Sequence, residues 1–191
     1  MNKLIAGFVA GLHKKKAEYL FNLIGGYLKK GGKIMDLGCG SGVFTKRLLD
    51  EGFEVTPVDV VPKLKVEGVS EIIYDGKHLP FQNKSFDQVL LVTVLHHVPH
   101  YRELLTEVAR VSKEIVIVED VYENGWDKFW IRFWDSVLNL EFFGHPHNNR
   151  SDKEWRQIFE EMGFVPKGSK DGVIREIVYG FKQKAYRLSV K

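Results

Sequence analysis

The residues best suited to hold a ligand form a glycine-rich turn early in the chain. A short apolar run ends at Asp36, and the sequence continues Leu-Gly-Cys-Gly-Ser-Gly, with Gly38, Gly40 and Gly42 preceding an amphipathic segment. Glycine adopts backbone angles that other residues avoid and lets a ligand approach the main chain, while a helix start offers unpaired N–H groups. The pattern predicts a nucleotide-type pocket between a strand and a helix. A tight turn without a ligand is the alternative.

The spacing of these glycines argues against a dinucleotide site. Gly-x-Gly-x-x-Gly would place its third glycine at position 43, where this chain has Val43. A further feature fits a nucleoside: Asp59 ends the next predicted strand about 20 residues beyond the loop, where a carboxylate can accept both hydroxyls of a ribose. A solvated surface carboxylate is the alternative for Asp59.

Three motifs in register resemble those of class I S-adenosylmethionine-dependent methyltransferases, over about residues 17 to 119. They are the glycine loop, Asp75-Gly76 followed by Leu79-Pro80-Phe81, and Ser85-Phe86-Asp87, with Lys77 standing where the family often has glutamate. The resemblance implies S-adenosylmethionine as cofactor and S-adenosylhomocysteine as product. It also implies that Asp75 holds the adenine amino group. The implied cofactor contacts are Asp36, Gly38, Gly40, Gly42, Asp59, Asp75, Gly76 and Thr93.

The end of the fourth predicted strand narrows the resemblance to one branch. The segment Thr93 to Val98 contains Leu-His-His, which is similar to the small-molecule (type 11) branch that acts on quinones and sterols. His96 or His97 could serve as a general base, because histidine titrates near neutrality. Histidine packed beside the site is the equal alternative.

Two acidic residues close the fifth predicted strand. We expect Glu119 and Asp120 to face the same crevice, where they would bind a substrate amine or take its proton. Capping of the next helix is the alternative for Asp120. The resulting candidate catalytic residues are His96, His97 and Glu119.

Five histidines raise the question of a metal site, at positions 96, 97, 100, 145 and 147. Pro99 interrupts the helical spacing that would align His96 with His100, and no cysteine or carboxylate cluster completes a tetrahedral set. We therefore predict no metal.

An aromatic-rich segment follows the fifth strand. Residues 121–150 are expected to form an insertion that caps the substrate side, because a helix over positions 126 to 138 would carry more apolar surface than one sheet contact needs. Ordinary core is the alternative. The candidate substrate-binding residues are Tyr122, Trp126, Trp130, His145 and His147, and they suggest a hydrophobic or aromatic acceptor.

Apolar segments alternate with amphipathic segments along the chain, and this order predicts a doubly wound α/β fold with a parallel sheet. Strands are expected at 33–37, 53–58, 69–73, 86–92 and 114–118, helices at about 17–28, 101–111 and 152–162. A closing antiparallel pair is expected over 164–166 and 173–181, around a turn at 168–172. The resemblance implies a Rossmann-like, mostly parallel sheet of seven strands with an antiparallel last strand and helices on both faces.

The 191 residues fit a single domain, 1–191, with an amino-terminal arm and helix over 1–30. The apolar arm is followed by lysines and is too short for a membrane span. We expect it to pack over the pocket, with peripheral membrane contact as the weaker alternative. A single cysteine, Cys39, suits a reducing cytoplasm. The scattered lysines, with a net charge of +3, do not suggest nucleic acid.

The sequence thus predicts an S-adenosylmethionine-dependent methyltransferase that acts on a small, hydrophobic or aromatic acceptor. The alternatives are a same-fold enzyme that modifies protein or RNA, and a non-catalytic S-adenosylmethionine-binding subunit that needs a partner. The oligomeric state and the attacked atom of the acceptor are not indicated.

Overall fold

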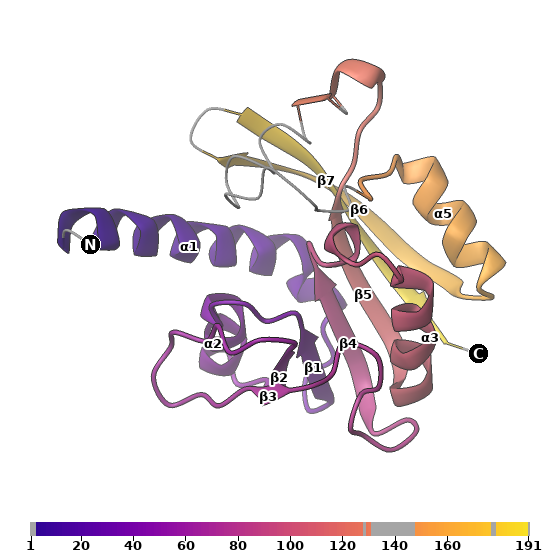
Figure 1. The fold of residues 1–191 in the computed structure, drawn as a ribbon, viewed down its shortest axis with the longest axis horizontal. Coiled ribbons are helices and arrows are strands. Elements are labelled where there is room, and N and C mark those ends of the chain that lie inside the picture. The colour runs from indigo at the N-terminus through magenta and orange to yellow at the C-terminus, as the bar shows by residue number, and fades with distance from the viewer. Residues whose placement is uncertain (1–2, 128, 131–147, 177–178, 191) are drawn as a thin grey trace.

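The computed structural model describes residues 3–127, 129–130, 148–176 and 179–190. It contains a seven-stranded mixed sheet in the order β3-β2-β1-β4-β5-β7-β6 (Figure 1). Strands β1 to β5 run parallel, and β7 runs antiparallel to both of its neighbours, so the predicted fold class is confirmed. The strands are β1 Lys33–Leu37, β2 Glu54–Asp59, β3 Ile72–Ile73, β4 Phe86–Val92, β5 Ser112–Asp120, β6 Val165–Glu176 and β7 Tyr179–Ser189.

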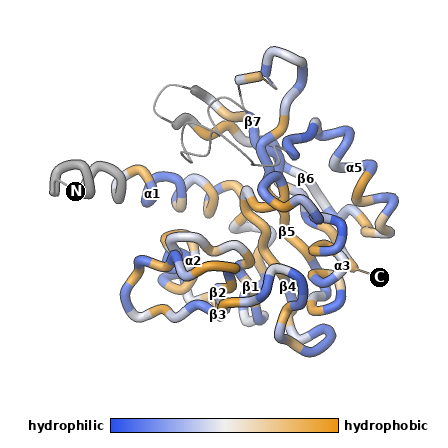
Figure 2. Tube along the Cα trace, in the orientation of Figure 1, coloured by the Kyte–Doolittle hydropathy of each residue, from blue (hydrophilic) through white to orange (hydrophobic). Residues whose placement is uncertain are grey.

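Helices cover both faces of the sheet. Helices α1 (Lys3–Ile24) and α2 (Val43–Asp50) share one hydrophobic cluster with Val116 and Val118 of β5. Helices α3 (Tyr101–Val111) and α5 (Asp152–Glu161) share another with Ile115 and Ile117. The central strands β4 and β5 are therefore apolar on both sides, as their colouring shows (Figure 2). We call these the α1 face and the α3 face.

The amino-terminal arm and the predicted first helix are one element. Helix α1 begins at Lys3, and its first turns extend away from the sheet (Figure 1). A short 3₁₀ helix, η1 (Gly25–Tyr27), follows it. The side chains of residues 3–6 and 8–10 are not described, so the expectation that the arm packs over the pocket stays a prediction.

The closing strand pair departs from the sequence prediction. No turn interrupts the chain at 168–172, because β6 continues through both Gly168 and Gly172 and pairs with β7 as far as Glu176. A Cβ at Gly168 would lie 3.2 Å from the Tyr27 hydroxyl, and one at Gly172 would overlap the hydroxyl of Tyr19. These glycines give room to tyrosines of the leading helical segment rather than forming a turn.

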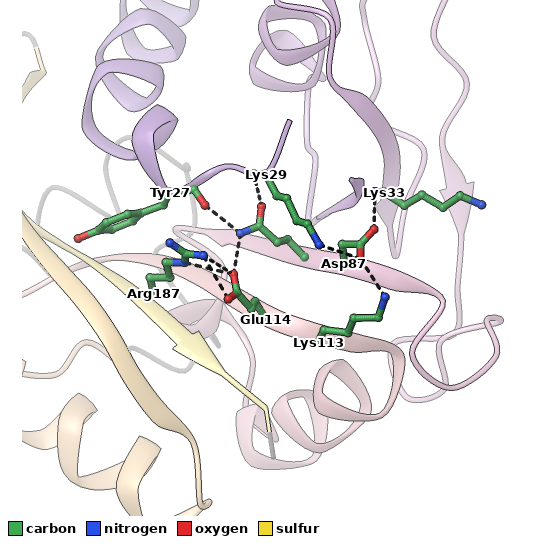
Figure 3. A network of polar contacts seen from close by, with 8 residues as sticks. Tyr27, Lys29, Lys33, Asp87, Lys113, Glu114 and Arg187 are labelled. Carbon is green, nitrogen blue, oxygen red and sulfur yellow. Dashed lines mark hydrogen bonds and ion pairs between the residues drawn. The ribbon is translucent and has the colours of Figure 1, made fainter. Parts of the chain in front are cut away.

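A polar network fastens the opposite end of the sheet from the predicted pocket (Figure 3). The buried Gln88 side chain accepts from the Lys29 N–H at 2.7 Å and donates to the Tyr27 carbonyl at 2.8 Å. It also donates to Glu114, which Arg187 contacts in turn, so η1, β4, β5 and β7 are tied together. This buried amide has a partner for each polar atom, as buried polar groups normally do.

Candidate functional site

The glycine loop connects β1 to α2 at the carboxyl edge of the sheet. Gly38, Gly40 and Gly42 all have positive φ, of 78°, 52° and 75°. A Cβ on Gly38 would lie 2.6 Å from Val94 Cγ2, so this position admits only glycine. A Cβ on Gly40 would meet nothing within 4 Å, so the space in front of this residue is open to a ligand.

Asp59 lies directly beside this loop. The Gly40 N–H donates to Asp59 Oδ2 at 2.9 Å, and the Val60 N–H donates to Oδ1 at 2.7 Å. The residue is only 7% exposed, which excludes the alternative of a solvated surface carboxylate. The Val61 N–H also donates to Oδ1, at 3.4 Å, so it is Oδ2 that retains a lone pair for a ligand hydroxyl.

Asp36 is buried behind the loop. Its Oδ2 accepts from the Thr45 hydroxyl at 2.6 Å, which links β1 to α2. Burial raises the pKa of the Asp36 carboxyl to about 6. The Thr45 hydrogen bond lowers this pKa, and the negative charge of Asp59 raises it further. A buried carboxylate of this kind favours a cationic ligand group nearby.

The segment after β3 presents a third carboxylate. Asp75 is exposed, and its Oδ1 accepts from the N–H groups of Lys77 at 2.8 Å and His78 at 2.7 Å. These two hydrogen bonds lower the pKa of Asp75, so it is charged at neutral pH. Gly76 follows with a φ of 79°. Asp75 is thus positioned by its own turn, two residues after Ile73, which pairs with Asp59.

Strand β4 ends in a strained residue. Thr93 has a φ of 54°, which is uncommon for a residue with a branched side chain, and its N–H donates to the Val118 carbonyl at 2.7 Å. Such strain is typical of functional sites. Thr93 therefore belongs with the predicted cofactor contacts by position.

Glu119 and His96 form a buried pair next to this strand end. His96 Nδ1 lies 2.5 Å from Glu119 Oε2, while Glu119 Oε1 accepts from the N–H groups of Val94 and Leu95. Glu119 is fully buried, so it holds the short helix η2 (Leu95–His97) and orients the His96 ring. The His97 ring is partly exposed, with its centroid 4.0 Å from that of His96. Of the two histidines, His97 is the more accessible to a substrate.

Whether Glu119 and Asp120 face the same crevice stays a prediction, although their side chains leave β5 toward opposite faces of the sheet. Neighbouring side chains of a strand point to opposite faces. Glu119 follows Ile115 and Ile117 on the α3 face, and Asp120 lies on the α1 face. Asp120 Oδ1 accepts from Gln183 Nε2 of β7 at 2.8 Å. Burial raises the pKa of Asp120, opposed by the charges of His96 and Lys16.

The described parts of the predicted substrate side lie at this edge as well. Tyr122 donates to Glu154 Oε2 of α5 at 2.6 Å. The Trp126 and Trp130 rings contact each other and Phe129, and Trp126 is 70% exposed rather than core. His145 and His147 lie outside the described residues.

The structure contains a set of buried polar atoms that the sequence does not predict. Asn149 is 4% exposed, yet neither atom of its side-chain amide has a hydrogen-bond partner, and the Tyr19 hydroxyl and Gln183 Oε1 also lack one. Leaving one such atom unpaired costs about 1–3 kcal/mol. No local sequence signal marks these residues, because their positions depend on strand register.

Two further findings concern the described residues alone. They contain no cluster of three or more histidine, cysteine or acidic side chains able to hold a metal ion. No helix among them combines the length and the apolar character that crossing a membrane requires.

Comparison with known proteins is consistent with this geometry. Residues 10–166 match a family model described as a methyltransferase domain. A demethylmenaquinone methyltransferase of Corynebacterium glutamicum is 36% identical over 90 residues, which is 45% of this chain and 39% of that protein. A sterol 4-C-methyltransferase of Caenorhabditis elegans is 24% identical over 123 residues, covering 56% and 37% of the two chains. This chain thus spans well under half the length of either relative.

A solved structure extends the likeness to nearly the whole fold. The magnesium protoporphyrin IX methyltransferase of Synechocystis, in a structure with bound SAH (S-adenosylhomocysteine), superposes with a TM-score of 0.66 at 14% identity. The match covers 99% of this chain and 89% of that one. Because the family model covers most of the sequence, the chain belongs to the methyltransferase domain family.

Proposed function

We propose that this protein transfers a methyl group from S-adenosylmethionine to a small, hydrophobic or aromatic acceptor. The observation that supports the proposal is the contact between Gly40 and Asp59, which sets an open main-chain surface beside a buried carboxylate whose Oδ2 retains a lone pair. A nucleoside fits such a cradle, with its ribose hydroxyls on Asp59. Asp75 would bind the adenine edge, and Asp36 would favour the cationic methionine amino group.

Bound S-adenosylmethionine supplies a methyl group on a sulfonium centre, which is a good leaving group. The chain's own task is therefore to hold an acceptor in line, and such positioning can lower a barrier by about 7–11 kcal/mol. His97 would remove a proton where the acceptor is a hydroxyl. His96 and Glu119 act as positioning residues, because they fix the turn on which His97 lies.

The acceptor class rests on two supports. One is the apolar surface beyond β5 that is formed by Trp126, Phe129 and Trp130. The other is that the two relatives described above are named as methyltransferases of a quinone and of a sterol. We further propose that residues 121–150 form the substrate-side cap of a single domain. A cytoplasmic location stays a prediction.

To test this, methyl-labelled S-adenosylmethionine is incubated with the protein and a cell extract, and the label is then measured in each fraction. Label that moves into the organic-soluble, small-molecule fraction supports the proposal. Label in acid-precipitable protein or RNA would favour the macromolecule-modifying alternative. Binding of S-adenosylhomocysteine without any transfer would favour a non-catalytic subunit. The control is Asp59→Ala, which should abolish the transfer.

A further inference from the structure

Four polar side chains from distant parts of the chain form one row across the sheet, at the carboxyl end of β5. Asp120 pairs with Gln183 of β7, and Gln183 pairs with Gly172 of β6. Side chains at paired positions share a face of the sheet. Because the Tyr19 hydroxyl lies where a Cβ on Gly172 would be, Tyr19 continues the row from α1.

Asn149 extends the row on the other side of β5. Val121 forms a parallel bridge with Arg150, so one step back along each segment places Asn149 beside Asp120. The Arg150 guanidinium lies over the rings of Tyr101 and Trp155 on the α3 face, at 4.4 and 5.1 Å. Since neighbouring side chains alternate, Asn149 belongs on the α1 face with Asp120. We call Tyr19, Asp120, Asn149 and Gln183 the polar row.

The polar row contains an unusual concentration of unpaired atoms. In the described part of the chain, five buried side-chain nitrogen or oxygen atoms lack a hydrogen-bond partner, and four of them belong to this row. They are the Tyr19 hydroxyl, Gln183 Oε1 and both amide atoms of Asn149. Native proteins bury few such atoms without a reason, and one established reason is a functional role. The network around Gln88 shows that this fold satisfies a buried amide elsewhere.

The chemistry of the row selects among ligand groups. Gln183 Oε1 and the Asp120 carboxylate can only accept from a ligand, whereas Asn149 Nδ2 can only donate. A ligand carboxylate cannot donate, and an ammonium cannot accept. A hydroxyl group does both. Burial, which raises the pKa of Asp120, disfavours charge at this place and so further favours a neutral ligand group.

We propose that the polar row binds a neutral hydroxyl group on the methyl acceptor, which makes the acceptor a hydroxylated ring compound. This inference rests on the proposed function, since it assumes that the crevice holds an acceptor. It names residues that position the acceptor and leaves the cofactor contacts unchanged.

Naphthalene derivatives provide matched probes for this idea. The dissociation constants of 1-naphthol, naphthalene, 1-naphthoate and 1-naphthylmethylammonium are measured on the full chain with saturating S-adenosylhomocysteine. We expect 1-naphthol to bind at least about tenfold more tightly than each of the others, from the hydrogen bonds that it alone completes. Failure of 1-naphthol to exceed the other three would overturn the hydroxyl assignment.

Two variants remove unpaired atoms, and each has a control that removes a paired one. Tyr19→Phe is matched by Tyr186→Phe, whose hydroxyl donates to Asp152 at 2.9 Å, and Asn149→Leu is matched by Gln88→Leu. In the ligand-free protein, Tyr19→Phe and Asn149→Leu should keep or raise the unfolding midpoint, while the controls lower it. The same two variants should weaken 1-naphthol binding by about fivefold and tenfold, and the controls should not change it.

The outcomes separate this inference from the proposed function. If the wild-type protein fails to bind S-adenosylhomocysteine, the proposed function fails first. If it binds that product normally but Tyr19→Phe and Asn149→Leu leave 1-naphthol binding unchanged, the row holds only solvent and the inference is overturned. Because Tyr19→Phe removes a single oxygen atom, it keeps the test decisive even where Asn149→Leu does not fold.

Discussion

Replacing Asp59 by asparagine should separate the geometry of this carboxylate from its size. In the structure both oxygens accept main-chain hydrogen bonds, from Gly40 at 2.9 Å and from Val60 at 2.7 Å. An asparagine can offer an oxygen to only one of these N–H groups, and its amide nitrogen would face the other. The substitution therefore disturbs the loop and removes the acceptor for one ribose hydroxyl.

The magnitude follows from the hydrogen bonds at stake. Hydrogen bonds to a charged group contribute about 1.5–3 kcal/mol each. The substitution removes one or two of them, either directly from the ligand or indirectly because the glycine loop shifts. We expect Asp59→Asn to weaken S-adenosylhomocysteine binding by about 2–4 kcal/mol, or roughly 30- to 700-fold. Isothermal titration calorimetry at pH 7.5 measures this change directly.

The matched control is Asp87→Asn. Asp87 also accepts a main-chain hydrogen bond, from Lys33 at 3.0 Å, but it lies in the network at the opposite end of the sheet (Figure 3). This control should lower stability and leave the dissociation constant unchanged. A folded Asp59→Asn protein with an affinity within about threefold of the wild type would refute the reasoning, because 1.4 kcal/mol already corresponds to tenfold.

Three further predictions concern the same edge of the sheet. Asp36→Asn should raise the free energy of unfolding at pH 8 by about 3 kcal/mol, because the raised pKa means that charged Asp36 destabilises the fold. The difference in unfolding free energy between wild type and Asp36→Asn should grow as the pH rises from 4 to 6, which urea titrations at each pH can measure. The variant should also bind S-adenosylhomocysteine more weakly than the wild type. In thermal melts, Gly38→Ala should lower the unfolding midpoint more than Gly40→Ala does. The Gly40→Ala variant should mainly weaken ligand binding, because its Cβ enters open space. Equal shifts of the two midpoints would contradict this. Glu119→Ala should destabilise the protein by about 3 kcal/mol, since the Val94 and Leu95 N–H groups and His96 lose their partner; an unchanged urea midpoint would rule out its positioning role.

Much of the fold could be predicted from local pattern. Continuous apolar runs identified β4 and β5, and the Ser151 capping box, with its Glu154 hydrogen bonds, confirms the start of α5. The predicted apolar faces of α3 and α5 are buried as expected. These features depend on residues close together in sequence, so local pattern is sufficient to predict them.

The failures share one physical cause, which is that the deciding contact is distant in sequence. Gly168 and Gly172 resemble turn residues, yet they are glycines because Tyr27 and Tyr19 occupy the space above them. Asn149 gives no sequence signal, because only its register beside Asp120 makes it notable. The cofactor candidates can be predicted from the sequence, since the glycine loop is a contiguous motif and Asp59 directly ends the next strand.

We propose that the glycine loop and the carboxylates of Asp36, Asp59 and Asp75 together bind S-adenosylmethionine. Calorimetric titration of the full chain with S-adenosylhomocysteine, beside a parallel titration with a nicotinamide dinucleotide, tests it most directly. We expect a dissociation constant in the micromolar range or tighter, which corresponds to about 8 kcal/mol, and no heat from the dinucleotide. No binding of S-adenosylhomocysteine together with clear binding of the dinucleotide would contradict it.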